Sequence, residues 1–358
     1  MRAAVFVGTE QPLSIENVEP AAPGPRDVVV EIGASGVCHS DLSVVHGYLP
    51  VPPGVVLGHE GTGRVVEVGK EVTKVKKGDR VVSTFVPACG VCWFCIHEQS
   101  NFCEREFETM MMMRGKRPDK SDYMTFTGLG TFAEAMTSSE DSVIKVETDV
   151  PDDQLALIGC GVTTGVGAAL NTAKVQPGST VAVVGCGGVG QSVIQGARIA
   201  GAARIIAVDL VEMKRKTAMQ FGATDMVDPG EGDAIAQVKA LTGGRGVDYS
   251  FEVIGLPETI TQAHGMARNG GTVCVVGMTR MEAQITLSAF ALFYEGKTIV
   301  GSKYGSAQVR RDFQRFVDLI ETGRLDTSSM VSRTIKLDEV NEAFRAMEAG
   351  EVIRSVIV

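Results

Sequence analysis

The stretch that decides the fold runs from residue 180 to residue 190 and reads Thr-Val-Ala-Val-Val-Gly-Cys-Gly-Gly-Val-Gly. Its first part, Thr180–Val184, is a short apolar run that predicts a buried strand. Residues 189–200 combine apolar side chains with glycine packing positions and predict a helix. Between them, Gly185 to Gly190 fit the pattern G-x-G-x-x-G. We therefore expect a strand, a tight turn and a helix in direct succession.

This glycine-rich turn is a candidate phosphate site. Its glycines, Gly185, Gly187, Gly188 and Gly190, allow the backbone to approach a pyrophosphate that lies on the helix N-terminus. Asp209 ends the next predicted strand, where a carboxylate accepts hydrogen bonds from the adenosine ribose and repels a 2′-phosphate. The pattern predicts a dinucleotide site that prefers NAD to NADP. The alternative is a turn that only packs helix on strand, with Asp209 as a cap.

Strands and helices alternate after this turn, whereas the first part of the chain is rich in strands. Strand-like runs at 204–208, 247–253, 272–276 and 298–301 alternate with helical patterns at 211–221 and after Pro257. This alternation predicts an α/β fold with a parallel, doubly wound sheet. Before it come Val-rich runs at 27–32, 64–68 and 79–83. After it, two helices are expected at 308–322 and 337–348, and a last strand at 352–358.

Length and composition set the class of protein. A chain of 358 residues suits two domains of about 150 residues each. Hydrophobic residues make up 44% and charged residues 22%, as in soluble globular proteins. The formal net charge of −9 argues against general binding to nucleic acid or to an anionic membrane. The sequence shows neither a signal peptide nor a window that approaches a membrane span, so we expect a cytoplasmic protein.

Two stretches offer ligands for a catalytic metal, namely Gly36-Val37-Cys38-His39-Ser40-Asp41 and Gly58-His59-Glu60-Gly61. Cys38 supplies a thiolate and His59 an imidazole, two of the three protein ligands that an open zinc site needs. The third ligand should come from a distant element, and Cys160 in Gly159-Cys160-Gly161 is the best candidate. Such a site leaves its fourth position to water or substrate.

Four of the eight cysteines, Cys89, Cys92, Cys95 and Cys103, lie close together. In a chain without signs of export, this clustering indicates a metal site rather than disulfides. Four thiolates leave no position for water, so the lobe at about 88–104 is predicted to hold a structural zinc ion. The alternative is four reduced cysteines that lie near one another by chance.

Together these motifs resemble those of the zinc-dependent medium-chain alcohol dehydrogenases along essentially the whole chain. The resemblance rests on GVCHSDL at 36–42, GHEGTGRV at 58–65, the four-cysteine stretch at 89–103 and GCG at 159–161, all ahead of GCGGVG and Asp209. It implies a GroES-like, β-rich catalytic domain at 1–161, a Rossmann coenzyme domain at 162–300, and a return to the catalytic domain at 301–358. The active site would lie between the two domains.

The resemblance also implies roles for residues around the metal. Cys38, His59 and Cys160 would bind the catalytic zinc, with Glu60 as a carboxylate beside it. Asp41 would orient His59, and Ser40 would touch the alcohol and pass its proton outward. Ser43 departs from the family, because many members carry there the histidine that ends the proton relay. The proton could then leave through water and the ribose, or through another group such as the nearby His46.

Further implied roles concern the coenzyme and the substrate. The coenzyme contacts would be made by His39 and Arg354 at the pyrophosphate, by Thr164 and Val189 beside the nicotinamide, and by Lys214 at the adenosine ribose. Leu49, Phe85 and Phe126 would line an apolar, partly aromatic substrate pocket. Leu49 stands where glutathione-dependent formaldehyde dehydrogenases carry an acidic residue, which argues against that substrate. The methionines at 110–113 could form an apolar lip or fill a core.

The predicted function is that of a zinc-dependent oxidoreductase with two zinc ions per chain. It would interconvert a primary or secondary alcohol, aliphatic or aromatic, and its aldehyde or ketone by hydride transfer to or from NAD. The close alternative is a dehydrogenase of a thiol hemiacetal adduct. More distant alternatives are a zinc-free quinone or enoyl reductase on the same scaffold, and a metal-bearing binding protein. The long segment between Cys103 and Cys160 is similar to that of dimeric members, so we expect a homodimer without nucleic-acid or membrane partners.

Overall fold

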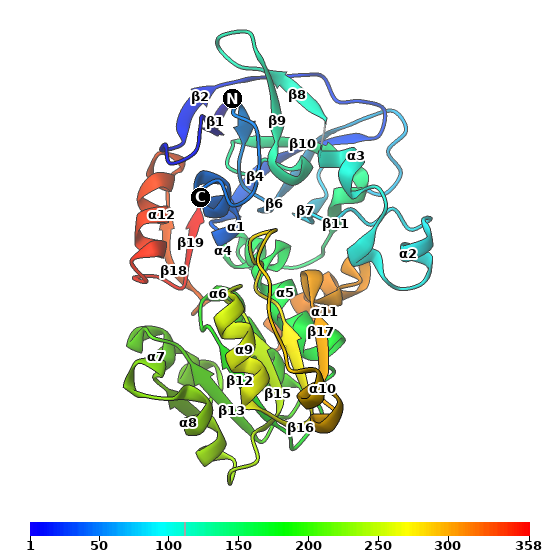
Figure 1. Cartoon of the computed structure of the whole chain (residues 1–358). Coiled ribbons are helices and arrows are strands. Elements are labelled where there is room, and N and C mark those ends of the chain that lie inside the picture. The colour runs from blue at the N-terminus through cyan, green and yellow to red at the C-terminus, as the bar shows by residue number, and fades with distance from the viewer. Residues whose placement is uncertain (111) are drawn as a thin grey trace. The chain divides into compact units, whose positions relative to one another are not determined.

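The computed structural model describes residues 1–110 and 112–358 (Figure 1). It divides into two compact units. The first comprises Met1–Cys160 together with Gln308–Val358, and the second comprises Gly161–Ala307. The second unit extends past the expected boundary at residue 300 because Ser302 and Ser306 both hydrogen-bond to Thr172, at 2.9 and 2.8 Å. The chain therefore leaves the first unit after Cys160 and returns to it at Gln308.

The second unit is built on one parallel sheet of six strands. Its order is β14-β13-β12-β15-β16-β17, and every neighbouring pair is parallel, which confirms the predicted doubly wound sheet. The strands are β12 (Thr180–Val184), β13 (Arg204–Val208), β14 (Asp225–Val227), β15 (Val247–Glu252), β16 (Ala267–Val275) and β17 (Thr298–Gly301). The connecting helices lie beside this sheet in Figure 1: α6 (Gly188–Ile199), α7 (Glu212–Phe221), α8 (Ala234–Leu241), α9 (Pro257–Met266) and α10 (Ala289–Glu295).

Apolar strand residues hold the second unit together. Ala182, Ile206 and Val208 pack against Val238 of α8 and Ala263 of α9, and each of these side chains is fully or almost fully buried. Burial of this kind stabilises the fold by roughly 25 cal/mol per Å² of apolar surface removed from water. The unit also contains α5 (Gly161–Gly167), the π-helical turn η5 (Ala168–Thr172) and the short turn η7 (Lys303–Ser306).

The first unit contains two sheets. One has the order β11-β7-β6-β4-β19-β18, with β10 added to β4. Its strands are β4 (Asp27–Gly36), β6 (Glu60–Val68), β7 (Arg80–Ser83), β10 (Ala135–Ser139), β11 (Val143–Lys145), β18 (Val331–Ile335) and β19 (Arg354–Ile357). The other sheet has the order β2-β1-β5-β9-β8-β3, with β1 (Arg2–Phe6), β2 (Ser14–Asn17), β3 (Glu19–Pro20), β5 (Val55–Val56), β8 (Met113–Lys116) and β9 (Asp122–Thr125).

Short helices complete the first unit. They are α1 (His39–Val45), α2 (Trp93–Ile96), α3 (Glu106–Met110), α4 (Asp152–Leu155), α11 (Val309–Glu321) and α12 (Val340–Glu348), together with the 3-10 turn η4 (Ala156–Gly159). A core of Phe6, Leu42, Phe132 and Phe344 joins α1 to α12. In Figure 1 the last strand, β19, runs beside β4, and the two strands pair antiparallel with Val356 opposite Gly36.

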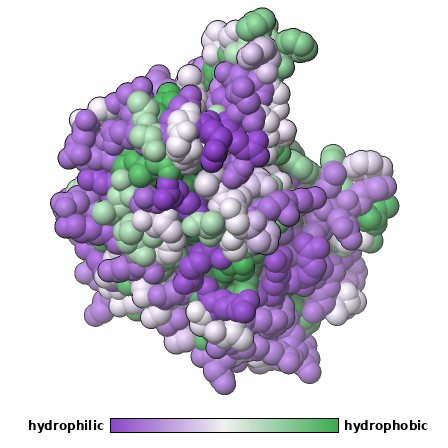
Figure 2. Space-filling model, turned by 90° about the horizontal axis from the view of Figure 1, so that it is seen from below, coloured by the Kyte–Doolittle hydropathy of each residue, from purple (hydrophilic) through white to green (hydrophobic). Residues whose placement is uncertain are grey.

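The face of the molecule drawn in Figure 2 is mainly polar. Hydrophilic residues cover most of the face in Figure 2, and the hydrophobic residues there form separate patches. Within the described residues no single helix is long and apolar enough to cross a membrane, although one bent pair, Asp152–Gly159 with Gly161–Thr172, meets the length and composition requirement jointly. In the methionine run, Met112 and Met113 are exposed, which disfavours the core alternative for these two side chains, while Met111 lies outside the described residues.

Candidate active site

Three elements of the first unit bring the predicted catalytic ligands together. One ligand atom from each of Cys38, His59, Glu60 and Cys160 lies within 4.8 Å of every other, and all four residues are buried. The register explains the meeting of the first three. Gly36, at the end of β4, pairs with Glu60, at the start of β6, so the residues that follow and precede these positions become neighbours. Cys160 arrives from η4, which packs against the same strands.

Gly36 is required at this register position. A Cβ atom there would collide with the carboxylate of Glu60. Gly58, just before His59, has a φ of +91° and would place a Cβ against Phe132. Both positions therefore favour glycine on steric grounds. The two quoted motifs thus carry glycines that let the two strands bring their ligands close.

Asp41 fixes the orientation of His59. Its Oδ1 lies 3.2 Å from Nδ1 of His59 and also accepts a hydrogen bond from the amide of Gly58 at 2.9 Å. Its Oδ2 accepts from the amide of Cys38 at 3.3 Å. With Nδ1 held in this way, Nε2 is buried and has no hydrogen-bond partner among the described residues. A buried ring nitrogen without a partner is costly unless it binds a ligand.

The two thiols share the remaining side of the cluster. A hydrogen bond from the Cys160 thiol lowers the pKa of Cys38 well below its usual value, while the same bond raises the pKa of Cys160 well above its own. Burial would lower the pKa of His59, but the Asp41 carboxylate and the Cys38 thiolate outweigh burial and raise it. Two sulfurs and one imidazole nitrogen within reach of one another, with an unpartnered Nε2, fit a zinc ion with an open fourth position.

Glu60 carries a buried ion pair that the sequence did not predict. The guanidinium of Arg354 in β19 binds its carboxylate, and both residues are buried. Burial raises the pKa of Glu60, and the charge of Arg354 opposes that rise. The expected contact between Arg354 and a pyrophosphate stays a prediction, because in this structure the guanidinium is turned toward Glu60. The pair follows from the alignment of β19 with β4, which the motifs alone do not reveal.

The residues considered for proton transfer lie on α1 or directly after its last residue. Ser40 places its Oγ 3.7 Å from the Cys38 sulfur, and the residue is partly exposed. Both ring nitrogens of His46 have carboxylate partners. One nitrogen lies 2.9 Å from Glu10 and the other lies 2.9 Å from Glu348. An imidazole bridged by two carboxylates in this way is not poised to accept a proton from Ser40.

Aromatic side chains cover the imidazole of the cluster. The rings of Phe85 and Phe126 meet His59 edge to face, with centroids 5.8 and 5.5 Å away. Leu49 is half-buried and packs against the core that includes Phe126. The three predicted pocket residues therefore lie in apolar surroundings, and two of them, Phe85 and Phe126, contact the imidazole of His59.

The four clustered cysteines form a second candidate metal site. One sulfur from each of Cys89, Cys92, Cys95 and Cys103 lies within 4.8 Å of every other. Backbone amides point at these sulfurs. The amides of Val91 and Cys92 donate to Cys89 at 3.4 and 3.3 Å, and the amide of Cys95 donates to Cys92 at 3.5 Å. Four sulfurs with amide donors fit a closed structural zinc site.

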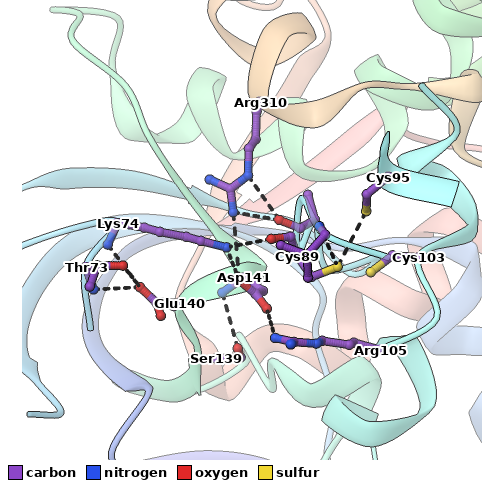
Figure 3. Close-up of polar contacts among 12 residues, drawn as sticks. Thr73, Lys74, Cys89, Cys95, Cys103, Arg105, Ser139, Glu140, Asp141 and Arg310 are labelled. Atoms are coloured by element: carbon purple, nitrogen blue, oxygen red, sulfur yellow. Dashed lines mark hydrogen bonds and ion pairs between the residues drawn. The ribbon is translucent and has the colours of Figure 1, made fainter. Parts of the chain in front are cut away.

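A buried carboxylate supports this lobe (Figure 3). Asp141 binds Lys74 and lies 3.0 Å from Nη1 of Arg105. Lys74 also donates to the carbonyl of Cys89 at 3.2 Å. Arg310, 4.0 Å from Asp141, donates twice to the carbonyl of Ala88, at 3.0 and 2.7 Å. The cations thus hold the backbone at the first cysteine ligand, and Lys74 and Arg105 keep the pKa of Asp141 low despite its burial. Sequence reasoning missed this network, since its members come from separate elements.

The glycine-rich turn of the second unit has the geometry of a phosphate cradle. Gly185 has a φ of +93°, and a Cβ on Gly190 would collide with the carbonyl oxygen of Gly185. A Cβ on Gly187 would meet nothing within 4 Å, so open space lies beside the N-terminus of α6. Space at a helix N-terminus with free approach to the backbone fits a pyrophosphate.

Asp209 lies at the carboxyl end of β13, beside this turn. Its Oδ2 accepts a hydrogen bond from the amide of Cys186 at 2.7 Å, and its Oδ1 accepts from the amide of Val211 at 2.8 Å. Both oxygens keep a lone pair for a further donor. Gln191 of α6 donates to the carbonyls of Cys186 and Lys214, so the turn and α7 are joined. Val189, Lys214 and Thr164 of the same unit are partly exposed, and His39 of the first unit is exposed.

Comparison with known proteins identifies the types of the two domains. Residues 24–148 match the alcohol dehydrogenase GroES-like domain, and residues 188–322 match the zinc-binding dehydrogenase domain. The chain is 36% identical over 367 aligned positions to a Mycobacterium tuberculosis protein called alcohol dehydrogenase D, with 99% of each chain covered.

Solved structures are similar as well. A benzyl alcohol dehydrogenase from Acinetobacter calcoaceticus shares 31% identity with a TM-score of 0.93, covering 99% of this chain and 98% of its own. A zinc-binding dehydrogenase from Sinorhizobium meliloti, bound to NADP, shares 28% identity with a TM-score of 0.82, covering 100% of this chain and 98% of its own. The relatives thus share the two-domain fold over its full length.

Proposed function

The chain belongs to the zinc-binding alcohol dehydrogenase family with a GroES-like N-terminal domain, and we propose that it oxidises primary or secondary alcohols with NAD. The observation that carries this proposal is the buried set of Cys38, His59 and Cys160, in which Nε2 of His59 lacks a partner. The aldehyde or ketone would be reduced in the reverse direction. The apolar surroundings of Leu49, Phe85 and Phe126 favour aliphatic or aromatic alcohols over polyols, whose hydroxyls would remain unpaired.

A few residues of the first unit would have defined parts in this chemistry. Cys38, His59 and Cys160 would hold a zinc ion, which would supply a Lewis acid that lowers the pKa of a hydroxyl, and NAD would supply the hydride acceptor. Asp41 holds His59 in the tautomer that presents Nε2 to the metal. Ser40 accepts the proton of the alcohol hydroxyl and, being partly exposed, passes it to water. Phe85 and Phe126 exclude water from the imidazole.

The second unit would bind the coenzyme. The open space at Gly187 receives the pyrophosphate at the N-terminus of α6, and Asp209 binds the hydroxyls of the adenosine ribose. We propose NAD as the preferred coenzyme on the strength of this carboxylate, although one solved relative binds NADP. The four-cysteine lobe would hold the second zinc ion of each chain, in a structural role.

A panel of alcohols tests the proposal. Aliphatic and benzylic alcohols are offered with NAD and with NADP, with and without an added thiol, and coenzyme reduction is followed by absorbance. The benzyl alcohol dehydrogenase among the solved relatives is a reason to include benzylic substrates. We expect NAD-linked oxidation that needs no thiol. A strict requirement for the thiol would favour the hemiacetal alternative, and no turnover by zinc-loaded protein that binds NAD would favour a binding protein.

We also propose that the protein forms a homodimer through the edge of the parallel sheet. β17 is the last strand of that sheet, and α10 beside it exposes Phe290, Phe293 and Tyr294. Exposed aromatic clusters of this kind are common at protein interfaces. Sedimentation velocity should show a dimer, and Phe293→Asp should shift the protein toward the monomer. A wild-type monomer at micromolar concentration would contradict the proposed dimer.

A further inference from the structure

Arg215, in the first turns of α7, links the ends of two neighbouring strands. Its Nη1 donates to the backbone carbonyl of Asp209 at 2.5 Å, and its Nη2 lies 2.7 Å from Oδ2 of Asp228. Asp209 directly follows β13, and Asp228 directly follows β14. Because Val208 pairs with Val227 in parallel register, both aspartates lie at the carboxyl edge of the sheet. Only 11% of the Arg215 side chain is exposed, so the link is largely shielded from water.

The position of this arginine matters for coenzyme choice. NADP differs from NAD by a phosphate on the adenosine ribose, and proteins commonly bind that phosphate with an arginine. Arg215 touches the carbonyl of the same residue whose carboxylate we assign to the ribose hydroxyls. A cation therefore lies next to the place where a 2′-phosphate would sit. The guanidinium of Arg215 is already paired with the negatively charged carboxylate of Asp228.

We propose that Asp228 is a second residue that makes the chain select NAD over NADP, because it binds Arg215 and so withholds this cation from a 2′-phosphate. The inference rests on the NAD preference proposed above. The two aspartates act in different ways. Asp209 repels the phosphate directly, whereas Asp228 occupies the arginine that could otherwise bind it.

The substitution Asp228→Asn isolates this role. The Oδ1 of Asp228 accepts a hydrogen bond from the amide of Gly230 at 2.8 Å and caps the short turn η6 (Pro229–Glu231). An asparagine oxygen can keep that bond, while the negative charge that holds Arg215 is lost. The chain also offers a matched control. Asp225 lies 3.3 Å from Arg204 at the opposite ends of the same two strands, and its side chain is 21% exposed, as is that of Asp228.

Calorimetric titration with ADP-ribose and with 2′-phospho-ADP-ribose tests the proposal on the full-length protein without relying on turnover. The quantity of interest is the ratio of the two dissociation constants. Asp228→Asn should shift this ratio toward the 2′-phosphate by about tenfold, the usual size for one arginine–phosphate contact. Asp225→Asn should leave the ratio unchanged. Adding Arg215→Met to Asp228→Asn should remove the gain, because the freed guanidinium is then absent.

Two results would overturn the proposal. One is a shift in Asp228→Asn no larger than in Asp225→Asn, with both variants melting as cooperatively as the wild type. The other is a gain that persists after Arg215→Met, since the effect would then come from net charge alone. The ratio of the two dissociation constants in the wild type tests the proposed NAD preference. The change of this ratio in Asp228→Asn tests the role of Asp228. The two conclusions therefore fail separately.

Discussion

Asp41 contacts both stretches that carry the proposed zinc ligands. It receives the amides of Cys38 and Gly58 and faces Nδ1 of His59, so it ties both metal-binding stretches together. The asparagine variant can keep at most part of this set, because its amide nitrogen cannot accept a hydrogen bond. The imidazole would then lose the partner that fixes its tautomer.

Asp41→Asn should therefore lower kcat/KM or the affinity for the catalytic zinc by about 10- to 100-fold, as is usual for the partner of a metal-binding histidine. Steady-state kinetics and zinc content after dialysis against a chelator measure the two effects. Asp119→Asn is the control, because Asp119 is exposed and lies 3.8 Å from its partner Arg117. Equal behaviour of the two variants would show that Asp41 does not orient His59.

His46 gives the molecule a pH-dependent contact. Hydrogen bonds from the imidazole to Glu10 and Glu348 raise its pKa above the ordinary value of 6.5, although partial burial opposes the rise. The bridge therefore adds stability below about pH 6.5, and this contribution is lost as the pH rises through the raised pKa. Melting temperatures of the wild type and His46→Gln should differ most at acid pH and converge at alkaline pH. A difference that does not change with pH would contradict the bridge.

At the residue scale, the candidate metal-binding side chains could be predicted from the sequence, whereas most of the residues that contact them could not. The spacing of the cysteines and the two histidine- and cysteine-bearing stretches identified both sulfur-rich clusters that the structure brings together. The partners of these clusters, such as Arg354 at Glu60 and Asp141 at the lobe, were not predictable. They depend on strand register and on contacts between distant segments, for which a linear pattern carries no signal.

Two glycines of the turn before α6, Gly187 and Gly190, allow coenzyme binding and folding stability to be tested separately. An alanine at Gly187 has open space and a φ of −72°, so the protein should fold with a stability change within about 1 kcal/mol. The added methyl group would occupy the space where we place the pyrophosphate. Gly187→Ala should therefore weaken NAD binding by about tenfold or more, as measured by calorimetry, because it displaces phosphate from the backbone amides.

Gly190→Ala provides the contrast. Its Cβ would collide with the carbonyl oxygen of Gly185, so this variant should lose stability in thermal unfolding. Undiminished NAD binding by Gly187→Ala would show that the phosphate lies elsewhere.

The four-cysteine lobe is held in place by ion pairs of Asp141 with cations from other segments of the chain. Asp141→Asn leaves Lys74 and Arg105 without their shared carboxylate, and we expect a loss of about 1–3 kcal/mol in the free energy of unfolding. Zinc should leave the lobe faster when a colorimetric chelator is added. Asp338→Asn, which removes an exposed partner of Arg2, should change neither quantity. Unchanged zinc release from Asp141→Asn would mean that the cations hold the Cys89 backbone without it.

At the element scale, periodicity predicted the parallel sheet closely. The strands expected at 180–184 and 204–208 match β12 and β13, and the helix expected at 211–221 matches α7 within one residue. Short pieces such as β3, β5 and α2 were not predicted. Their two to four residues carry no period, and hydrogen bonds to distant strands or local turns decide them.

At the scale of the whole molecule, one of the two units is formed by two separate segments of the chain. Residues from Gln308 onward complete the first unit, and β19 pairs with β4 beside the metal ligands. Composition and periodicity alone would not have revealed this return, because a last apolar strand can join either sheet. The resemblance to a known family supplied it, and the family matches across 24–148 and 188–322 agree with two domains of different type.

We propose that the protein holds two zinc ions with separate roles. The site at Cys38, His59 and Cys160 would leave a coordination position open, and the four-cysteine lobe would surround its ion completely. The most direct test is to measure zinc per chain by atomic emission, together with alcohol oxidation, in the wild type and in Cys38→Ala. We predict about two zinc ions and activity in the wild type, and about one zinc ion without activity in the folded variant. Alcohol oxidation that survives Cys38→Ala would contradict this proposal.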